Sequence, residues 1–329
     1  YHNICTHRGT ELVDEGSGQL KSTIVCPYHR WTFGLDGELR GVPNESECFP
    51  GLNKKENGLN KASVGIFKGI VFVHPQESPD LSFDDWLASL PDVAWPFDLT
   101  DERLIGSDEI VYEMKCNWKV FYENAIDGYH LGYLHENTLG KVFPKLNVWV
   151  EHGQHLVWYS TERNNGERNA LPTLINDALE QYKVKKIDKA LGQNYGGVYM
   201  FFPTTIVTPN PYGVAISELV PVSPGVTLLK ARNWAPKGQI GRRQNLKDIP
   251  GYDAKSGVIT SENWKKHPLE TLDFQTEDVW VCEKQQRAMR SPSFKIRHLA
   301  AGAGAESPLA HFQQCVLDYM PSDVAIAAE

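Results

Sequence analysis

The chain has 329 residues, of which 41% are hydrophobic and 22% are charged, and its formal net charge at pH 7 is −8. This length suits two domains or one large one, and the composition is that of an ordinary globular protein. The negative charge argues against nucleic acid and anionic membrane surfaces as partners. No stretch reaches the roughly 20 apolar residues of a membrane span. We therefore expect no nucleic-acid partner and no membrane partner.

The six cysteines do not have the pattern of a disulfide framework in a chain of this size. Two of them stand in metal-type spacing, and the other four are scattered: Cys48, Cys116, Cys282 and Cys315. The N-terminus has no basic, apolar, small-residue signal pattern. These features predict a reducing, cytoplasmic location.

The first motif lies at the start of the chain. Cys5 and His7 are followed, after 18 intervening residues, by Cys26 and His29. Structural zinc sites usually pair Cys with Cys and His with His along the chain, so a zinc site, or no metal at all, is the alternative here. One Cys and one His from each of two loops suit a [2Fe-2S] cluster of Rieske type, with both cysteines on one iron and both histidines on the other.

Short strands predict a small β domain around this motif. Residues 24–26 and 31–35 are expected as strands that meet a hairpin turn at Asp36-Gly37. Residues 65–74 are expected as a closing hairpin that turns at Lys68-Gly69.

A polar, proline-bearing connector begins at Pro75 and contains a short predicted helix at residues 82–90. We place the domain boundary near residue 100. This assigns residues 1–100 to the first domain with its connector and residues 101–329 to the second. Residues 107–116 alternate like a strand and lead into the second motif.

The second motif is Asp127, His130 and His135, on a helix that Asn117 is expected to open. Two imidazoles and a distant carboxylate form the facial triad of non-haem Fe(II) oxygenases, which leaves coordination positions open. Histidines five residues apart point about 140° apart on a regular helix. Both reach one metal only if the helix widens or breaks, and Gly132 is the expected place. The alternative is that His135 merely caps the helix or lies on its surface.

The rest of the chain predicts an α+β domain. Residues 147–161 are expected as a strand pair, and residues 198–234 as a meander of three strands. Between them, residues 167–193 are charged and helical, and we favour a solvated helical insert over a pocket lid. Residues 262–291 predict an amphipathic helix with Asp278, Cys282 and Gln285 on one face. Together these elements predict an antiparallel sheet wrapped around a helix.

Three stretches resemble one known family. CTHRG (5–9) and CPYHRW (26–31) resemble the Rieske motif of the ring-hydroxylating oxygenase alpha subunits, and DGYHLGYLH (127–135) resembles their mononuclear iron motif. The resemblance covers nearly the whole chain. It implies a small all-β Rieske domain followed by a helix-grip (START-like) catalytic domain. It also implies a cluster bound by Cys5, His7, Cys26 and His29.

The third iron ligand is also chosen by this resemblance. EDVWVCEKQQR (277–287) resembles the helix where the family keeps its carboxylate ligand. We choose Asp278, with Glu277 and Glu283 as competitors, and expect His130, His135 and Asp278 to bind one Fe(II).

The chain departs from the family pattern in three places. The gap between His7 and Cys26 is about one residue longer than usual, which the run from Glu15 to Gln19 can absorb, and Arg30 stands where many members have glycine. Strands that normally precede the first Cys loop are absent, so we expect an N-terminally truncated fragment. None of these departures removes a predicted ligand.

The resemblance implies the terminal oxygenase component of a Rieske non-haem iron oxygenase. Its cofactors would be one [2Fe-2S] cluster and one mononuclear Fe(II), and it would insert oxygen from O2 into a small aromatic substrate. No dinucleotide-binding fingerprint appears, so a separate NAD(P)H-dependent reductase or ferredoxin would supply electrons. The alternative is oxidation of a quaternary amine or betaine, for which the nine tryptophans offer a cation cage. A pure electron carrier would not need the second domain.

Asp127 is interpreted as a relay and not a ligand. Its carboxylate is expected to hold the free N–H of His130, and in the family it also reaches the Rieske histidine of a neighbouring subunit, here His29. The resemblance therefore implies a homotrimer, or an α3β3 assembly with a small subunit. Asn124, Glu123 and Tyr129 are expected to line that junction.

Overall fold

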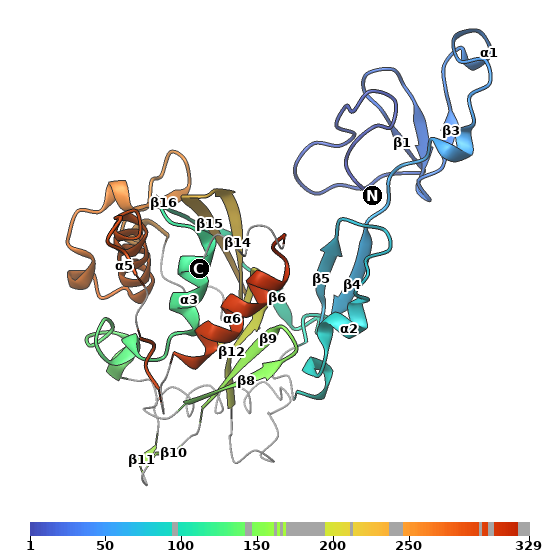
Figure 1. The fold of residues 1–329 in the computed structure, drawn as a ribbon. Helices are drawn as coiled ribbons and strands as arrows, with labels where there is room; N and C mark the ends of the chain where they lie inside the picture. The colour runs from blue at the N-terminus through green and yellow to red at the C-terminus, as the bar shows by residue number, and fades with distance from the viewer. Residues whose placement is uncertain are drawn as a thin grey trace. The chain divides into compact units, whose positions relative to one another are not determined.

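The computed structural model describes residues 1–93, 98–141, 147–160, 163–164, 167–168, 195–210, 213–236, 246–295, 298–301 and 306–321. The chain forms two compact units, Tyr1–Trp86 and Leu87–Glu329 (Figure 1). The division falls inside the predicted connector. No helix among the described residues is long and apolar enough to cross a membrane.

A small antiparallel sheet forms the first part of the N-terminal unit. Its strands are β1 (Thr23–Val25), β2 (Thr32–Gly34) and β3 (Leu39–Gly41), in that order. The turn after β2 needs glycine, because Gly37 has a φ of 80° and a Cβ there would stand 2.3 Å from the ring of Tyr1. The predicted strands and turn are therefore confirmed, with β1 shifted by one residue and β2 shorter by two residues than predicted.

The predicted closing hairpin is present as β4 (Ser63–Phe67) and β5 (Ile70–His74). Its turn residues, Lys68 and Gly69, have φ angles of 52° and 79°, as a two-residue hairpin turn requires. Short helices follow each sheet, α1 (Glu45–Cys48) and α2 (Phe83–Leu87). α2 was predicted at residues 82–90, and Phe83 packs directly over Gly65 of the hairpin.

One large sheet dominates the second unit, and all its pairings are antiparallel except that of β16 with β7. The described residues give it nine strands, in the order β16-β7-β15-β14-β13-β12-β9-β8 with β6 against β15. Their bounds are β6 Leu104–Gly106, β7 Ile110–Met114, β8 Asn147–His152, β9 His155–Ser160, β12 Tyr195–Phe201, β13 Thr205–Asn210, β14 Gly213–Ser223, β15 Val226–Pro236 and β16 Val258–Thr260. The predicted strand pair is confirmed, and the predicted meander is present with four strands and not three, since its first predicted strand is divided into β12 and β13.

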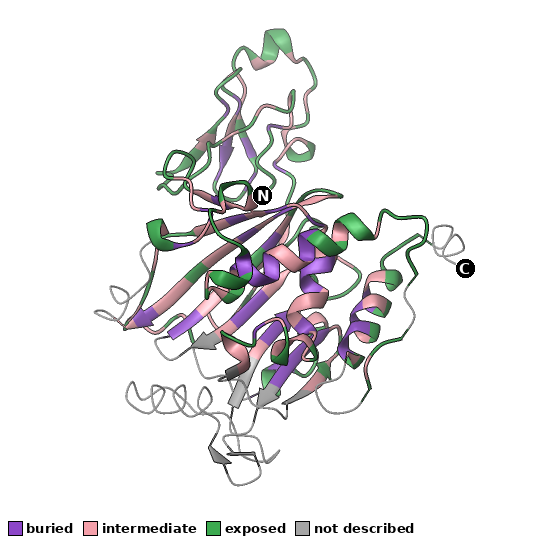
Figure 2. Ribbon diagram, turned by 90° about the vertical axis from the view of Figure 1, so that its left-hand side faces the viewer, coloured by how far each residue is buried: buried purple, intermediate pink, exposed green. Residues whose placement is uncertain are grey.

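Three helices of this unit gather around one core: α3 (Trp118–Ile126), α5 (Phe274–Ala288) and α6 (Ser307–Asp318). α3 lies against the sheet and contacts both α5 and α6 (Figure 1). Figure 2 shows buried residues on the sheet and on the helix faces turned toward it. The core includes Tyr122 of α3, whose ring stacks on Phe312 of α6 at 4.1 Å. The predicted α+β class, a sheet wrapped around a helix, is confirmed.

Three predicted boundaries are wrong. α3 opens at Asn117, as predicted, but ends at Ile126, because Asp127 takes extended dihedral angles (φ −81°, ψ 108°). α5 begins at Phe274 and not at residue 262, since Asp273 caps it. Glu167 and Arg168, predicted as helical, form strand β11 (Glu167–Arg168) against β10 (Arg163–Asn164). The rest of the predicted insert, residues 169–193, lies outside the described residues.

Candidate metal centres

Two loops of the N-terminal unit share one backbone construction. In each, the cysteine N–H donates to the carbonyl five residues later, Thr10 at 2.8 Å in the first loop and Trp31 at 2.9 Å in the second. The residue four after the cysteine donates back to the cysteine carbonyl, and it has a positive φ: Gly9 at 76° and Arg30 at 60°. The two predicted donor pairs therefore lie on matching loops.

The thiols of Cys5 and Cys26 contact each other, are 2% and 1% exposed, and form no disulfide. Burial raises the pKa of the Cys5 thiol. Burial acts the same way on Cys26, but the backbone N–H groups of His29 and Tyr28 outweigh it and hold the pKa of Cys26 below its usual value. Amide donors aimed at sulfur are what a buried thiolate needs.

The backbone N–H groups of the predicted histidine donors are directed at these thiols, His7 at Cys5 and His29 at Cys26. The rings of His7 and His29 are 4.8 Å apart. Nδ1 of His7 is buried and has no hydrogen-bond partner among the described residues, which is rare unless an ion or a cofactor binds there. Buried thiols that form no disulfide, on loops that also carry such a nitrogen, fit a [2Fe-2S] cluster.

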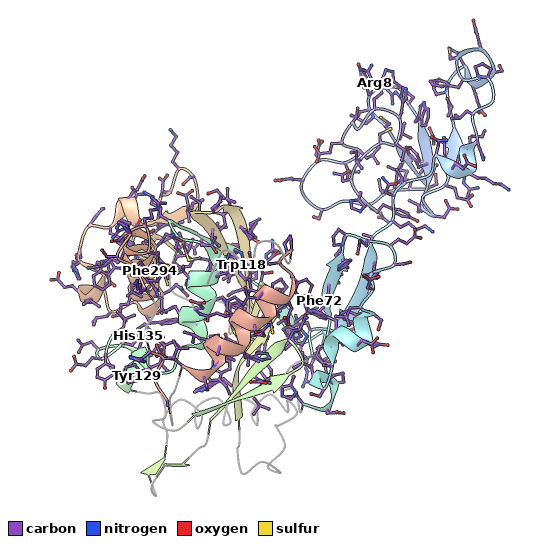
Figure 3. All side chains as sticks on the ribbon, viewed as in Figure 1. Arg8, Phe72, Trp118, Tyr129, His135 and Phe294 are labelled. Atoms are coloured by element: carbon purple, nitrogen blue, oxygen red, sulfur yellow. The ribbon has the colours of Figure 1, made fainter. Side chains whose placement is uncertain are left out.

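The two histidines have different surroundings. The His7 ring stacks on the buried Trp31 at 4.7 Å with an interplanar angle of 7°, and Phe49 contacts both rings edge-on. The His29 ring instead lies 3.7 Å from that of Tyr28, which is exposed. Arg8, labelled in Figure 3, places its guanidinium 5.6 Å from the Tyr28 ring. His29 is half-buried, as His7 is, but it lies beside an exposed side chain.

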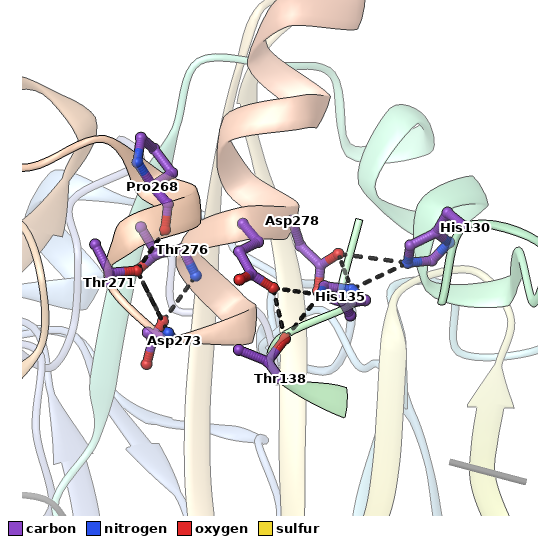
Figure 4. Close-up of polar contacts among 9 residues, drawn as sticks. His130, His135, Thr138, Pro268, Thr271, Asp273, Thr276 and Asp278 are labelled. Carbon is purple, nitrogen blue, oxygen red and sulfur yellow. Dashed lines mark hydrogen bonds and ion pairs between the residues drawn. The ribbon is translucent and has the colours of Figure 1, made fainter. Parts of the chain in front are cut away.

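In the second unit, one atom from each of three side chains faces a common point. Nε2 of His130 is 3.2 Å from Nε2 of His135, and Oδ1 of Asp278 is 3.6 Å and 3.0 Å from these nitrogens. Figure 4 shows the three side chains converging from two separate segments. Two imidazoles and one carboxylate within this reach fit a divalent cation that keeps open positions.

The other edge of each imidazole faces a carboxylate. Nδ1 of His130 is 3.3 Å from Oδ2 of Asp127, and Nδ1 of His135 is 2.6 Å from Oε2 of Glu277. The contact at His135 is a hydrogen bond, as is usual for a metal-binding histidine, whereas Nδ1 of His130 lies within ion-pair distance of Asp127 without a hydrogen bond. The contact predicted between Asp127 and His130 is present, but it is made across a loop and not along one helical turn.

The start of α5 fixes the direction of its two consecutive carboxylates. Asp273 accepts hydrogen bonds from the N–H and the hydroxyl of Thr276 at 2.8 Å and 2.7 Å (Figure 4), a common N-terminal cap. Glu277 and Asp278 follow in the first turns of the helix. Side chains at consecutive helical positions diverge by about 100°, so these two carboxylates cannot point the same way.

The loop after α3 brings the two histidines together. His130 opens the 3-10 turn η3 (His130–Gly132), whose carbonyl oxygen at His130 accepts from Tyr133 and Leu134 at 2.9 Å. Neither histidine therefore lies on a regular helix, because α3 already ends at Ile126, so the break that was predicted near Gly132 comes before both of them. The break explains how residues five apart in sequence face one point.

The carboxylates change the protonation of this cluster. Burial alone would lower the pKa of His130, but Asp127 and Asp278 outweigh it and raise the pKa to about 9. Burial likewise opposes the charge on His135, yet Asp278 and Glu277 raise its pKa. Burial would raise the pKa of Asp278, but the two histidines lower it. The carboxylates therefore favour positive charge on the two imidazoles.

The three residues predicted to line a subunit junction make contacts within their own chain. The carbonyl of Asn124 accepts from the N–H of Asp127 at 3.2 Å. Oε1 of Glu123 accepts from Gln313 of α6 at 2.9 Å, and burial raises the pKa of Glu123. Tyr129 is 54% exposed, and its ring lies 5.5 Å from that of Tyr133. Their role at a junction stays a prediction.

Two residues that follow His135, Thr138 and Gly140, were not predicted to belong to the site. The hydroxyl of Thr138 donates to Glu277 at 2.6 Å. Gly140 lies so close to the backbone that a Cβ would stand 2.8 Å from the carbonyl oxygens of His135 and Leu131. The only sequence signal was their position three and five residues after a predicted ligand.

Comparison with protein families agrees with both centres. Residues 1–59 match the model of the Rieske [2Fe-2S] domain, and residues 102–322 match that of the ring hydroxylating alpha subunit (catalytic domain). The chain therefore belongs to the ring-hydroxylating alpha-subunit family and carries a Rieske domain. The family predicted from the motifs is confirmed.

Two curated relatives show the range of the family. The chain is 38% identical over 302 residues to the chloroplastic choline monooxygenase of Beta vulgaris, covering 90% of this chain and 58% of the relative. It is 39% identical over 146 residues to the large oxygenase component of the naphthalene 1,2-dioxygenase system of Pseudomonas fluorescens, covering 42% of this chain and 31% of the relative. This chain thus spans less than two thirds of the choline monooxygenase.

A solved structure shares the fold. The crystal structure of a quaternary ammonium Rieske monooxygenase with L-carnitine has a TM-score of 0.66 and 21% sequence identity, covering 97% of this chain and 77% of that one. At this identity the likeness supports the α+β Rieske oxygenase fold alone.

Proposed function

We propose that this chain is the terminal oxygenase component of a Rieske non-haem iron oxygenase. The observation that supports this most is the convergence of His130, His135 and Asp278 on one point, in a chain whose other unit presents paired Cys and His donors. Two imidazoles and a carboxylate suit Fe(II) that must keep positions free for O2 and substrate. A pure electron carrier has no use for this second donor set.

Each donor set has a separate role in the proposal. Cys5, His7, Cys26 and His29 would hold the cluster, and His130, His135 and Asp278 would hold the mononuclear Fe(II). When bound, the cluster supplies single electrons and the Fe(II) activates O2 toward the substrate. The chain itself orients the imidazoles through carboxylates and keeps His135 fully buried. A separate reductase or ferredoxin would deliver the electrons.

We propose a quaternary ammonium compound as the substrate. The match to choline monooxygenase extends over 90% of this chain, and other curated relatives are named for glycine betaine and carnitine. An aromatic hydrocarbon, the substrate class expected from the motifs alone, is the second candidate, supported by the match to the naphthalene dioxygenase component.

Product analysis with ¹⁸O2 tests both candidates. The reconstituted protein, with a reductase and NADH, is offered choline, glycine betaine, carnitine and naphthalene in separate reactions. Monooxygenation of a quaternary amine places one labelled oxygen in the product and the other in water, with two electrons consumed. Ring dihydroxylation places both labelled atoms in the product. Absence of any oxygenated product, with both iron centres loaded, would contradict the proposed function.

We further propose that Asp127 carries the electron path between subunits. Its carboxylate lies beside Nδ1 of His130, and the half-buried His29 lies beside the exposed Tyr28, where a neighbouring subunit would meet the cluster loops. A head-to-tail trimer, alone or with a small subunit, would bring His29 of one subunit to Asp127 of the next. The six unpaired cysteines agree with a reducing compartment.

A further inference from the structure

Glu277 is a buried carboxylate with two donors on one oxygen. Its exposed fraction is 1%. Oε2 lies 2.6 Å from Nδ1 of His135 and 2.6 Å from the hydroxyl oxygen of Thr138. Acidic side chains are almost never this buried unless they are paired, so the interaction with these two donors holds the carboxylate in place.

The contact with His135 is on the edge of the ring away from the candidate iron site. Nε2 of that ring faces Asp278 at 3.0 Å and His130 at 3.2 Å. A neutral imidazole has one N–H and one lone pair, and the hydrogen bond at one nitrogen decides which is which. A carboxylate at Nδ1 therefore fixes the proton there and leaves the lone pair of Nε2 directed at the metal.

Thr138 fixes Glu277 in turn. Its hydroxyl has one proton, which it donates to Oε2 of Glu277. Its backbone N–H donates to the carbonyl of His135 at 2.9 Å, so the turn that carries the histidine also carries the group that holds the carboxylate. His135, Thr138 and Glu277 thus form one hydrogen-bonded group that joins two segments about 140 residues apart in sequence.

We propose that Glu277, held by Thr138, is a positioning residue for the mononuclear iron: it sets the tautomer and orientation of His135 and supplies the buried charge that balances the metal. This inference rests on the proposed function, since it needs Fe(II) at the three converging donors. It assigns to Glu277, which the sequence left as a competing ligand, a role on the opposite side of the histidine.

The charge argument is independent of the tautomer argument. Fe(II) with two neutral imidazoles and the carboxylate of Asp278 carries one net positive charge. An uncompensated buried charge is costly, and Glu277 is an anion within hydrogen-bond reach of one ligand. Replacing it by glutamine keeps the shape of the side chain but removes the more deeply buried of the two outer carboxylates, so that only the partly exposed Asp127 remains beside a ligand.

The test measures how tightly the protein binds Fe(II), not turnover. The affinity is determined anaerobically by competition with a chromogenic chelator, in protein whose Rieske spectrum is intact. We expect Glu277→Gln to weaken Fe(II) binding about 10- to 100-fold, the usual effect of losing such a partner. Glu277→Asp keeps the charge with a shorter reach, so its affinity should lie between those of Glu277→Gln and wild type. Glu270→Gln, which removes an exposed carboxylate of the same unit, is the matched control and should bind as wild type does.

A second variant separates positioning from mere structure. Thr138→Val removes the hydroxyl but keeps the volume, and should weaken Fe(II) binding about 2- to 10-fold, as for one lost hydrogen bond. Because Thr138 acts through Glu277, the double variant with Glu277→Gln should be no weaker than Glu277→Gln alone. Co(II) substituted for Fe(II) should show a changed visible spectrum in Glu277→Gln and an unchanged one in Glu270→Gln.

The outcomes distinguish this inference from the proposed function. A wild-type chain that binds no Fe(II) contradicts the proposed function. Wild-type protein that binds Fe(II), with a Glu277→Gln variant of the same affinity and the same Co(II) spectrum, overturns the inference alone. If Asp278→Asn retains the metal while Glu277→Gln loses it entirely, Glu277 is the ligand and the inference is also overturned.

Discussion

The groups that surround the donor atoms have opposite charge in the two candidate metal centres of this chain. The cluster loops surround their donors with backbone N–H groups and aromatic rings, and Nδ1 of His7 has no partner among the described residues. The iron donors instead contact one another, and carboxylates contact the far edges of both imidazoles. Amide groups stabilise electron-rich sulfur, whereas carboxylates stabilise a cation.

This difference teaches that the two centres depend on their metals to different degrees. The iron donors satisfy one another by ion pairs and hydrogen bonds, so their arrangement has its own stability. In the cluster loops, Nδ1 of His7 has neither a hydrogen bond nor an ion pair among the described residues, whereas Nδ1 of His130, which also lacks a hydrogen bond, faces the carboxylate of Asp127. Substitutions of ligands in the first unit should therefore abolish cluster binding altogether, whereas substitutions around the iron donors of the second unit should have effects of graded size.

The largest effect is expected at the cluster. Cys5→Ser or Cys26→Ser should abolish cluster binding, because a hydroxyl does not replace a thiolate as a ligand to iron. Labile sulfide and the Rieske-type EPR signal should disappear while one equivalent of Fe(II) still binds. A variant that keeps the signal, or zinc without labile sulfide in the wild-type protein, would contradict the cluster assignment.

The next effect is expected at the iron donors. His130→Ala and Asp278→Ala should abolish turnover, since each removes one of three ligands, and should leave the Rieske spectrum unchanged. Metal analysis and absorption spectra of one preparation check both statements. Loss of the cluster signal in either variant would show that the two centres are not independent.

A substitution at Asp127 should leave the metal content unchanged but should greatly slow electron transfer between the two centres. Asp127→Asn should keep both metals and the oligomer but stop electron transfer to the mononuclear iron. Stopped-flow mixing of the cluster-reduced variant with O2 and substrate measures cluster oxidation. Oxidation and product formation at the wild-type rate would make Asp127 a structural carboxylate. Loss of iron would also contradict the relay.

A graded effect should appear with pH in protein freed of the mononuclear iron. The pKa of His130 is raised to about 9, above its ordinary value near 6.5. The interaction of the protonated His130 with Asp127 and Asp278 thus contributes fully to the free energy of unfolding below pH 6.5, and this contribution is lost as the pH rises through about 9. We expect the free energy of unfolding of the second unit to fall by up to about 3 kcal/mol over that window. Urea unfolding at several pH values measures this fall, which His130→Ala should lack.

The smallest effect is expected at Arg30. It has a φ of 60° where the matching loop has glycine at 76°, and a left-handed conformation costs a non-glycine residue roughly 1–2 kcal/mol. Arg30→Gly should stabilise the cluster loop by about 1 kcal/mol net, because glycine is also more flexible in the unfolded chain. Thermal loss of Rieske absorbance measures this. Arg8→Gly, in the other loop, should give no such gain.

Features that depend on a few neighbouring residues could be predicted from the sequence, whereas several helix boundaries could not. The hairpin turn at Lys68-Gly69 and the opening of α3 at Asn117 depend on a few neighbouring residues, and both predictions are confirmed. The early end of α3 was missed, because apolar residues continue past Asp127 at helical spacing. The start of α5 was also misplaced, although Asp273 and Thr276 carry a recognisable cap.

The candidate iron site shows the same limit. The His-x4-His spacing was local enough to predict, and the structure brings those histidines to Asp278. The choice between Glu277 and Asp278 was not local, because it depends on which edge of His135 each carboxylate meets across 142 residues of sequence. Spacing along one helix does not contain that information.

The consecutive placement of Glu277 and Asp278 makes the site tolerate insertions and deletions unequally. One residue inserted after the Asp273 cap would move Glu277 into the direction now taken by Asp278, with Thr276 in the place of Glu277. A carboxylate would still face the iron, although its histidine would lose a charged partner. One residue deleted there would bring Val279 to the iron instead. The iron site therefore keeps a carboxylate ligand after a one-residue insertion at the start of α5, but not after a one-residue deletion.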